Sequence, residues 1–147
     1  MKSLLTVLHA LWLGAHMFVG YVVAPVLFRY AEEGMFDKRV AGDMAGDLFE
    51  MVTYFGLFVG MVWYVLLRQQ RLPSRLMGSI VALLALGQFL VTPVIVAIKQ
   101  QQNHWLLDLV GGSFGVWHGT SSMLYLLVSM ALLVFTWQKL AIKTTRF

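Results

Sequence analysis

Four long stretches without a charged side chain constrain this chain more than any other feature of its sequence. Counting histidine as neutral, they cover residues 4–28, 51–67, 76–98 and 109–138. A helix needs about 20 mostly apolar residues to cross the hydrocarbon core of a bilayer. The composition agrees, because 59% of the 147 residues are hydrophobic and only 12% are charged, whereas soluble domains carry about 25% charged residues. The stretches therefore predict an integral membrane protein.

The predicted fold is all-α, a single four-helix transmembrane bundle. Residues 40–51 keep helical spacing of apolar side chains, so the second helix is expected to extend beyond the membrane on its upstream side. The first stretch exceeds the roughly 7–15 residues of a signal-peptide core and lacks a convincing cleavage site, which indicates a retained helix. We expect the four helices at about residues 4–30, 48–67, 76–98 and 114–138.

Basic residues divide unequally between the two sides that four spans create. One side carries seven of the eleven Lys and Arg and no acid, while the other carries four and all seven acids. The seven are Lys2, Arg68, Arg71, Arg75, Lys139, Lys143 and Arg146. Because Lys and Arg favour the cytoplasmic side of a membrane, both termini are predicted to be cytoplasmic.

Small residues spaced four apart indicate where helix backbones approach each other in a membrane. Gly56 and Gly60 form such a pair in the second helix, and Gly115 and Gly119 form one at the start of the fourth. We therefore predict that these four glycines pack against neighbouring helices. One of the two rows is also available for self-association, so the expected partners are the lipid bilayer and a second copy of the chain.

Three stretches together resemble a known family. They are GYVVAPVLF at residues 20–28, AGDMAGDLF at 41–49 and FGVWHGTSSMLYLL at 114–127. In this order, in a four-helix chain, they resemble the bacterial membrane proteins related to transmembrane protein 205, domain of unknown function 4149. The resemblance covers most of the chain and implies its fold and a multi-pass location in the bacterial inner membrane. It carries no catalytic residues over to this chain and therefore implies no mechanism.

Intramembrane histidines are the first candidate for chemistry, because ionisable side chains inside a bilayer are costly. His9 and His16 share a face of the first helix, and His16 is expected near mid-bilayer. At about 1.5 Å per residue, His16 lies roughly 20 Å below the outer surface and His118 roughly 6 Å below it. One haem therefore does not bridge these two histidines. No cofactor is predicted, although a mono-histidine or intersubunit haem stays open beside the simpler interpretation of neutral, hydrogen-bonded imidazoles.

A polar cluster near the outer surface is the second candidate. Arg29, Glu50 and His118 are the polar residues nearest the outer ends of three helices, and Ser121 follows His118 by one turn. Each would lose hydration at that depth, and an ion pair beside a histidine offsets the cost. We therefore predict that they meet and form a binding mouth. The alternative is that Arg29 and Glu50 extend separately to headgroups.

Motifs exclude more functions than they indicate. The chain has no cysteine, and it contains no phosphate-binding loop, nucleophile elbow or zinc-protease motif. No catalytic or metal-ligating residue and no nucleic-acid partner is predicted, and any protein partner remains unidentified. The sequence favours a non-enzymatic bundle that binds a partner or handles a small solute or metal. The alternative is a haem- or quinone-linked redox protein that uses the intramembrane histidines.

Overall fold

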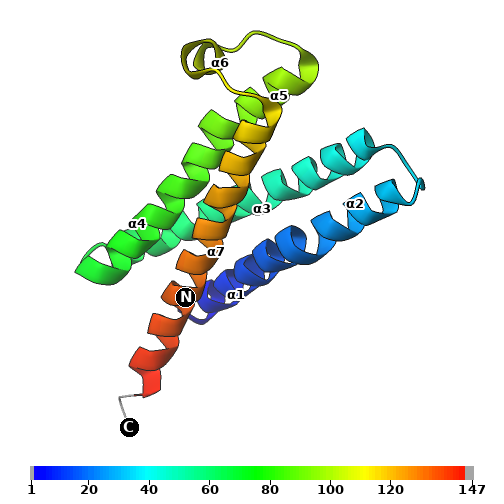
Figure 1. Cartoon of the computed structure of the whole chain (residues 1–147). Helices are drawn as coiled ribbons and strands as arrows, with labels where there is room; N and C mark the ends of the chain where they lie inside the picture. The colour runs from blue at the N-terminus through cyan, green and yellow to red at the C-terminus, as the bar shows by residue number, and fades with distance from the viewer. Residues whose placement is uncertain (1, 145–147) are drawn as a thin grey trace.

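The computed structural model describes residues 2–144, with the side chains of residues 3–139. Four helical rods in this part of the chain are long and apolar enough to cross a membrane. They cover residues 3–32, 38–67, 71–100 and 114–139 (Figure 1). The all-α bundle of four membrane helices is thereby confirmed, and the rods are longer at most ends than the sequence predicted.

Kinks and loops divide the rods into shorter elements. In chain order these are α1 (Lys2–Phe18), η1 (Val19–Val23), α2 (Ala24–Glu32), α3 (Lys38–Leu67), α4 (Arg71–Leu86), η2 (Gly87–Val91), α5 (Thr92–Gln100), α6 (Trp105–Val110) and α7 (Phe114–Thr144). The predicted upstream extension of the second helix is present, because α3 already begins at Lys38. Its first turn is capped by the Asp37 carboxylate, which accepts a hydrogen bond of 2.6 Å from the Arg39 amide.

The rods form two hairpins that diverge. The first hairpin joins α1–η1–α2 to α3, and the second joins α4–η2–α5 to α7. Contacts of α1 with α7 and of α3 with α4 connect the hairpins, whereas α2 packs on α3 and α5 packs on α7 within each one. The hairpins are therefore joined where α1 begins and α7 ends, here called the terminal end. They separate toward the end that carries α6, here called the loop end (Figure 1).

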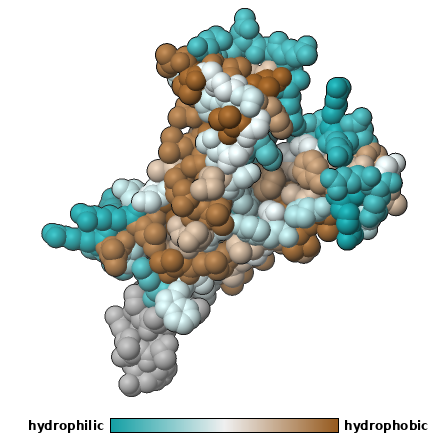
Figure 2. All heavy atoms as spheres, viewed as in Figure 1, coloured by the Kyte–Doolittle hydropathy of each residue, from teal (hydrophilic) through white to brown (hydrophobic). Residues whose placement is uncertain are grey.

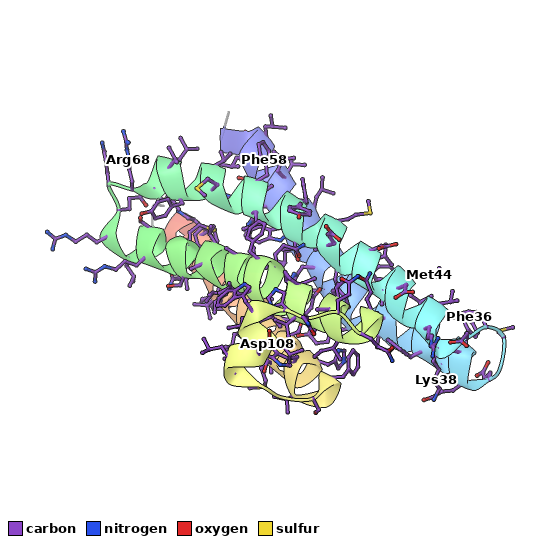
Figure 3. All side chains as sticks on the ribbon, turned by 90° about the horizontal axis from the view of Figure 1, so that it is seen from above. Phe36, Lys38, Met44, Phe58, Arg68 and Asp108 are labelled. Atoms are coloured by element: carbon purple, nitrogen blue, oxygen red, sulfur yellow. The ribbon has the colours of Figure 1, made fainter. Side chains whose placement is uncertain are left out.

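The surface has the distribution of polarity that a bilayer requires. Figure 2 shows hydrophilic residues gathered at the tips of the molecule and hydrophobic residues covering the helices between them. Arg68 and Lys38 lie at opposite ends of α3, and Phe58 and Met44 between them are exposed (Figure 3). Phe58 is 62% exposed, which suits a lipid-facing position because lipid tails are as apolar as its ring.

A short π-helix interrupts the first rod of each hairpin just before a proline. The first, η1, ends two residues before Pro25, and the second, η2, ends two residues before Pro93. Proline has no amide hydrogen to donate and its ring crowds the preceding turn, so the helix widens and bends there. At the second site the Thr92 hydroxyl donates to the Gly87 carbonyl at 3.0 Å.

The two hairpins correspond in the limits of their elements and at six buried positions. Adding 68 to the limits of η1 and α2 gives those of η2 and α5. The same offset relates three buried positions of α1 to buried positions of α4, while an offset of 76 relates three of α3 to three of α7. The pairs are His9 and Met77, Trp12 and Ile80, His16 and Leu84, Val52 and Val128, Gly56 and Leu132, and Val59 and Phe135. The hairpins are thus parallel structural repeats, an arrangement known from membrane proteins with internal symmetry.

Candidate functional site

Two hydrogen bonds between a histidine and a hydroxyl side chain, here called rungs, connect α1 to α7 inside the bundle. The imidazole Nε2 of His9 lies 2.8 Å from the Thr136 hydroxyl, and that of His16 lies 3.1 Å from the Ser129 hydroxyl. Both histidines are buried, with 6% and 1% of their surface exposed. The rungs form because the histidines and the hydroxyl residues are each spaced seven apart, which places both sets on facing sides of antiparallel helices.

The hydrogen bonds of the hydroxyls determine the tautomer of both histidines. The Ser129 hydroxyl donates to the Tyr125 carbonyl at 2.9 Å, and the Thr136 hydroxyl donates to the Leu132 carbonyl at 2.8 Å. A hydroxyl has one hydrogen to donate, so each must accept from its imidazole. Nε2 therefore carries the proton, and Nδ1 carries a lone pair. Among the described residues, neither Nδ1 atom has a hydrogen-bond partner.

Tyr125 organises the rung nearer the loop end. Its ring stacks on the His16 ring with centroids 3.9 Å apart and an angle of 14°, and its hydroxyl donates to the His16 carbonyl. Phe49 of α3 meets the other side of the phenol edge-on at 5.0 Å. Tyr21 of η1 donates to the Ser129 hydroxyl at 3.0 Å. We call His16, Tyr21, Tyr125 and Ser129 the apex cluster.

Tyr125 packs against the π-helix η1, one of the two π-helices that precede a proline. Its hydroxyl donates to the carbonyl of His16, which lies four residues before Gly20. A side chain inserted at this point adds to the effect of Pro25 on the helix. The phenol ring lies directly against Gly20, where an added Cβ would collide with it. Glycine is therefore required at this position.

The apex cluster lies where the two hairpins begin to separate. Tyr21 is its most accessible member and is 46% exposed. Ser122 lies three residues before Tyr125 and seven before Ser129, so the three share a face of α7, and Ser122 is exposed. Figure 2 shows the molecule hollowed between the α2–α3 arm and the α5–α7 arm. A polar face of α7 therefore leads from this cleft to the buried rung.

The rung nearer the terminal end is enclosed by aromatic rings. The centroid of the His9 ring lies 5.9 Å from Trp12, 6.2 Å from Trp63 and 5.3 Å from Phe135. The Lys139 ammonium lies 5.3 Å from the Trp63 centroid and 5.4 Å from the Phe135 centroid. His9 is nevertheless slightly more exposed than His16.

The polar cluster predicted from Arg29, Glu50 and His118 does not pair. Arg29 forms an exposed ion pair of 3.8 Å with Glu33, one turn away on its own rod. His118 stacks on Phe114 of its own helix at 5.6 Å. Among the described residues, Glu50 forms no ion pair with either. Pairing fails because Arg29 and His118 belong to diverging arms, so a binding role for these residues and the half-buried Ser121 stays a prediction.

The two predicted glycine rows behave differently. A Cβ on Gly56 would collide with the Trp12 indole, and one on Gly60 would lie 2.8 Å from Val81, so both glycines lie close to a side chain of another helix. A Cβ on Gly119 would meet nothing within 4 Å, and one on Gly115 would meet only the Ser113 hydroxyl. This second row lies on the diverging part of α7, away from the other helices described, and a packing role for it stays a prediction.

Sequence reasoning singled out His16 but missed its partners Tyr21, Tyr125 and Ser129. One signal was available, since the seven-residue spacing of Ser129 and Thr136 repeats that of the histidines. The three stretches that carried the family resemblance supply a second signal. They contribute Gly20 and Tyr21, Phe49, and Tyr125, and the first three of these residues lie around the Tyr125 ring.

The chemistry available at the apex cluster is hydrogen bonding by neutral groups. Its side chains are an imidazole, two phenols and an alcohol, and no carboxylate is among the described contacts of these four residues. The described residues also contain no group of three or more His, Cys, Asp or Glu positioned to hold a metal ion. The arrangement suits binding and orientation of a small molecule.

Comparison with known proteins places the chain in one family. Residues 7–104 match the family described as a domain of unknown function (DUF4149). This match covers two thirds of the chain, including α1 to α5 and the π-helices η1 and η2. No curated protein and no solved structure matches the chain.

Proposed function

The chain belongs to the DUF4149 family, and from that premise we propose that it is a non-enzymatic membrane protein that binds a small solute. The solute enters the cleft between the two hairpins at the loop end. It is held at the apex cluster, where His16, Tyr21, Tyr125 and Ser129 meet inside the membrane-spanning part of the bundle. Ligand sites of membrane proteins with parallel or inverted repeats commonly lie at such repeat interfaces.

One observation carries this proposal: a buried polar rung lies at the point where the cleft closes. Polar groups inside a membrane are costly and therefore mark function more often than packing. The other interface between the hairpins shows that packing does not require them. At the positions equivalent to His16 and Ser129, the α3–α4 interface has the buried Leu84 and the half-buried Thr53.

The distribution of charge supports an orientation for the cleft. In the sequence, the side of the membrane that holds both termini carries seven basic residues and no acid, so we propose that the terminal end is cytoplasmic. The loop end, and with it the cleft, then opens to the outer side of a bacterial inner membrane. The solute would accordingly be taken up from outside the cell.

The redox alternative has less support from the geometry. Both imidazole Nε2 atoms are already occupied by hydroxyls of α7, and Nε2 is a common position for haem ligation. Both histidines also project from one helix, so they do not face each other across an iron. Solute binding requires neither hydrogen bond to break and is therefore the function proposed.

Cysteine accessibility tests the cleft directly, because the chain has no cysteine of its own. In the variant Ser122→Cys the thiol is expected to lie in a water-filled cleft, where it ionises and reacts as a thiolate. In Met130→Cys, at a 56% exposed position on the same helix, the thiol should face lipid. A membrane-impermeant methanethiosulfonate added to the loop-end side should modify the first variant at least about tenfold faster than the second.

Two further variants make the comparison decisive. Phe58→Cys, on the outward face of α3, is a second lipid-facing control (Figure 3). Tyr21→Cys probes the wall of the cleft opposite Ser122 and should also react. Equal, slow modification of the cysteines at positions 21, 122, 130 and 58 would show that water does not enter between the hairpins, and the proposed function would then be abandoned.

A further inference from the structure

An apolar groove of about 190 Å³ lies between α1 and α3, and the side chains that line it are all aliphatic or aromatic. Leu5 and Val59 are buried and form its floor, whereas Leu4 and Phe58 are 63% and 62% exposed and form its rims. The groove is therefore open to the hydrocarbon of the bilayer. An apolar cavity of about 150 Å³ accepts a benzene molecule, so this groove has room for a segment of a lipid acyl chain.

The groove runs toward the terminal end of the bundle. On α3 its lining extends from Phe58 to Leu66, one residue before that helix ends at Leu67. On α1 it extends from Leu8 back to Leu4, two residues after that helix begins. At about 1.5 Å per residue, the lining of α3 covers roughly 12 Å along the helix. One leaflet supplies about half of the 30 Å hydrocarbon core, so the groove matches the acyl chains of the leaflet at the terminal end.

Three arginines lie at the end of α3 toward which the groove runs. Arg68 directly follows α3, Arg71 begins α4, and Arg75 lies one turn later. Figure 3 shows Arg68 at the end of α3 that lies beyond Phe58. All three arginines are exposed, and within the described part of the chain none of them forms an ion pair. Residues 51–107 contain no acid, so the charge that α3 and α4 present at this end is only positive.

We propose that this groove binds an acyl chain of an anionic phospholipid, whose phosphate is held by Arg68 and the neighbouring Arg71. Guanidinium groups bind phosphate oxygens through strong, often bidentate hydrogen bonds, and basic pockets beside membrane helices select anionic headgroups. An apolar lining does not distinguish one headgroup from another, so the arginines must provide the selectivity. The groove lies at the opposite end of the bundle from the mouth of the proposed solute cleft and is a separate site.

Native mass spectrometry of the full chain in detergent tests the selectivity. The two probes are dioleoyl phosphatidylglycerol and dioleoyl phosphatidylcholine, which have the same acyl chains and differ in the net charge of the headgroup. The anionic lipid should bind at least about fivefold more tightly, the effect expected of a single arginine. Arg68→Gln should remove most of this preference, whereas Arg39→Gln, in the first turn of the same helix, should retain it.

A pair of valines on α3 tests the groove itself. Val62 lines the groove, whereas Val65 lies outside it and is exposed to lipid. Val62→Phe should weaken the binding of both lipids several-fold, because the added ring fills the space of the acyl chain, and Val65→Phe should leave both affinities unchanged. Leu4→Trp, at the exposed rim, takes the place of Val62→Phe if that variant does not fold.

Three results would overturn the inference. Equal affinity of the parent chain for the two lipids would show that its apolar surface is merely solvated by lipid. Equal effects of Arg68→Gln and Arg39→Gln would show that the headgroup is not held at the end of α3. Equal effects of a groove-filling variant and Val65→Phe would show that the acyl chain does not occupy the groove.

Discussion

At the scale of single residues, the packing of the bundle depends on glycines that leave room for aromatic rings of neighbouring helices. Gly20 leaves the space that the Tyr125 ring occupies, and Gly56 leaves the space for the Trp12 indole. Both glycines lie where a large aromatic ring of one helix meets the backbone of another. Gly119 has no such neighbour, although it belongs to a similar sequence pattern. The pattern alone does not distinguish a packed glycine from an open one.

Alanine at two of these positions provides a matched test. Gly56→Ala should destabilise the bundle by about 1–3 kcal/mol, because one added methyl overpacks the contact with Trp12. Gly119→Ala should leave stability unchanged or raise it by up to about 1 kcal/mol, since glycine is costly in an open helix. Unfolding of both variants in mixed micelles measures the difference. Equal destabilisation by the two substitutions would contradict the packing described for α7.

At the scale of helices, α1 and α7 are held by polar rungs, whereas the equivalent interface of α3 with α4 has apolar side chains in place of the two histidines. Met77 and Leu84 of α4 occupy the positions that His9 and His16 occupy on α1, and all four are buried. A polar rung is no stronger than apolar packing as long as both partners are present. It becomes costly when one partner is removed, because a buried donor then loses its acceptor.

A double-mutant cycle should reveal this asymmetry. Ser129→Ala leaves the His16 Nε2–H without an acceptor and is expected to cost about 1–3 kcal/mol. In the double variant His16→Leu with Ser129→Ala the imidazole donor is absent and only the hydroxyl of the 46% exposed Tyr21 loses its acceptor, so the variant should recover a large part of that loss. Free energies of unfolding measured for the two single variants and the double variant check the prediction. A double variant no more stable than Ser129→Ala would show that the rung is not the coupled unit described above.

At the scale of the whole molecule, two parallel hairpins joined near the terminal end and open at the loop end define a polarity along the membrane normal. One ion pair links the arms near the loop end, between the Lys99 ammonium and the Asp43 carboxylate at 2.9 Å. Its two side chains are 37% and 71% exposed, and exposed ion pairs contribute little to stability. The opening between the arms is therefore not closed by a strong contact at the loop end.

Topology follows from the charges of the two ends. Reporter domains fused after Arg71 and at the C-terminus are expected to report a cytoplasmic location, and one inserted near Asp37 should report the outside. The reason is the seven-to-four division of basic residues, with every acid on the loop-end side. Paired phosphatase and fluorescent-protein fusions at the three positions are the measurement. Phosphatase activity of the C-terminal fusion would reverse the assignment and place the cleft on the cytoplasmic side.

The sequence by itself determined the number of membrane helices, their approximate limits and the upstream extension of α3. These properties depend on local composition, because any uncharged stretch of sufficient length satisfies its backbone hydrogen bonds as a helix in lipid. The start of α7 at Phe114 after two glycines with positive φ was predictable for the same local reason.

Only the tertiary structure decided which side chains meet. Arg29, Glu50 and His118 have suitable depths for pairing, yet depth does not specify the direction of a side chain or the angle between hairpins. His16 finds Ser129 and Tyr125 because α1 and α7 face each other, and those partners lie more than 100 residues away in the sequence. In a membrane, apolar side chains contact lipid and other helices almost equally well, so hydrophobic pattern does not specify the neighbour of each helix face. The neighbour of each helix face is specified by close contacts at glycines, by aromatic packing and by hydrogen bonds. These interactions form only once the helices have assembled.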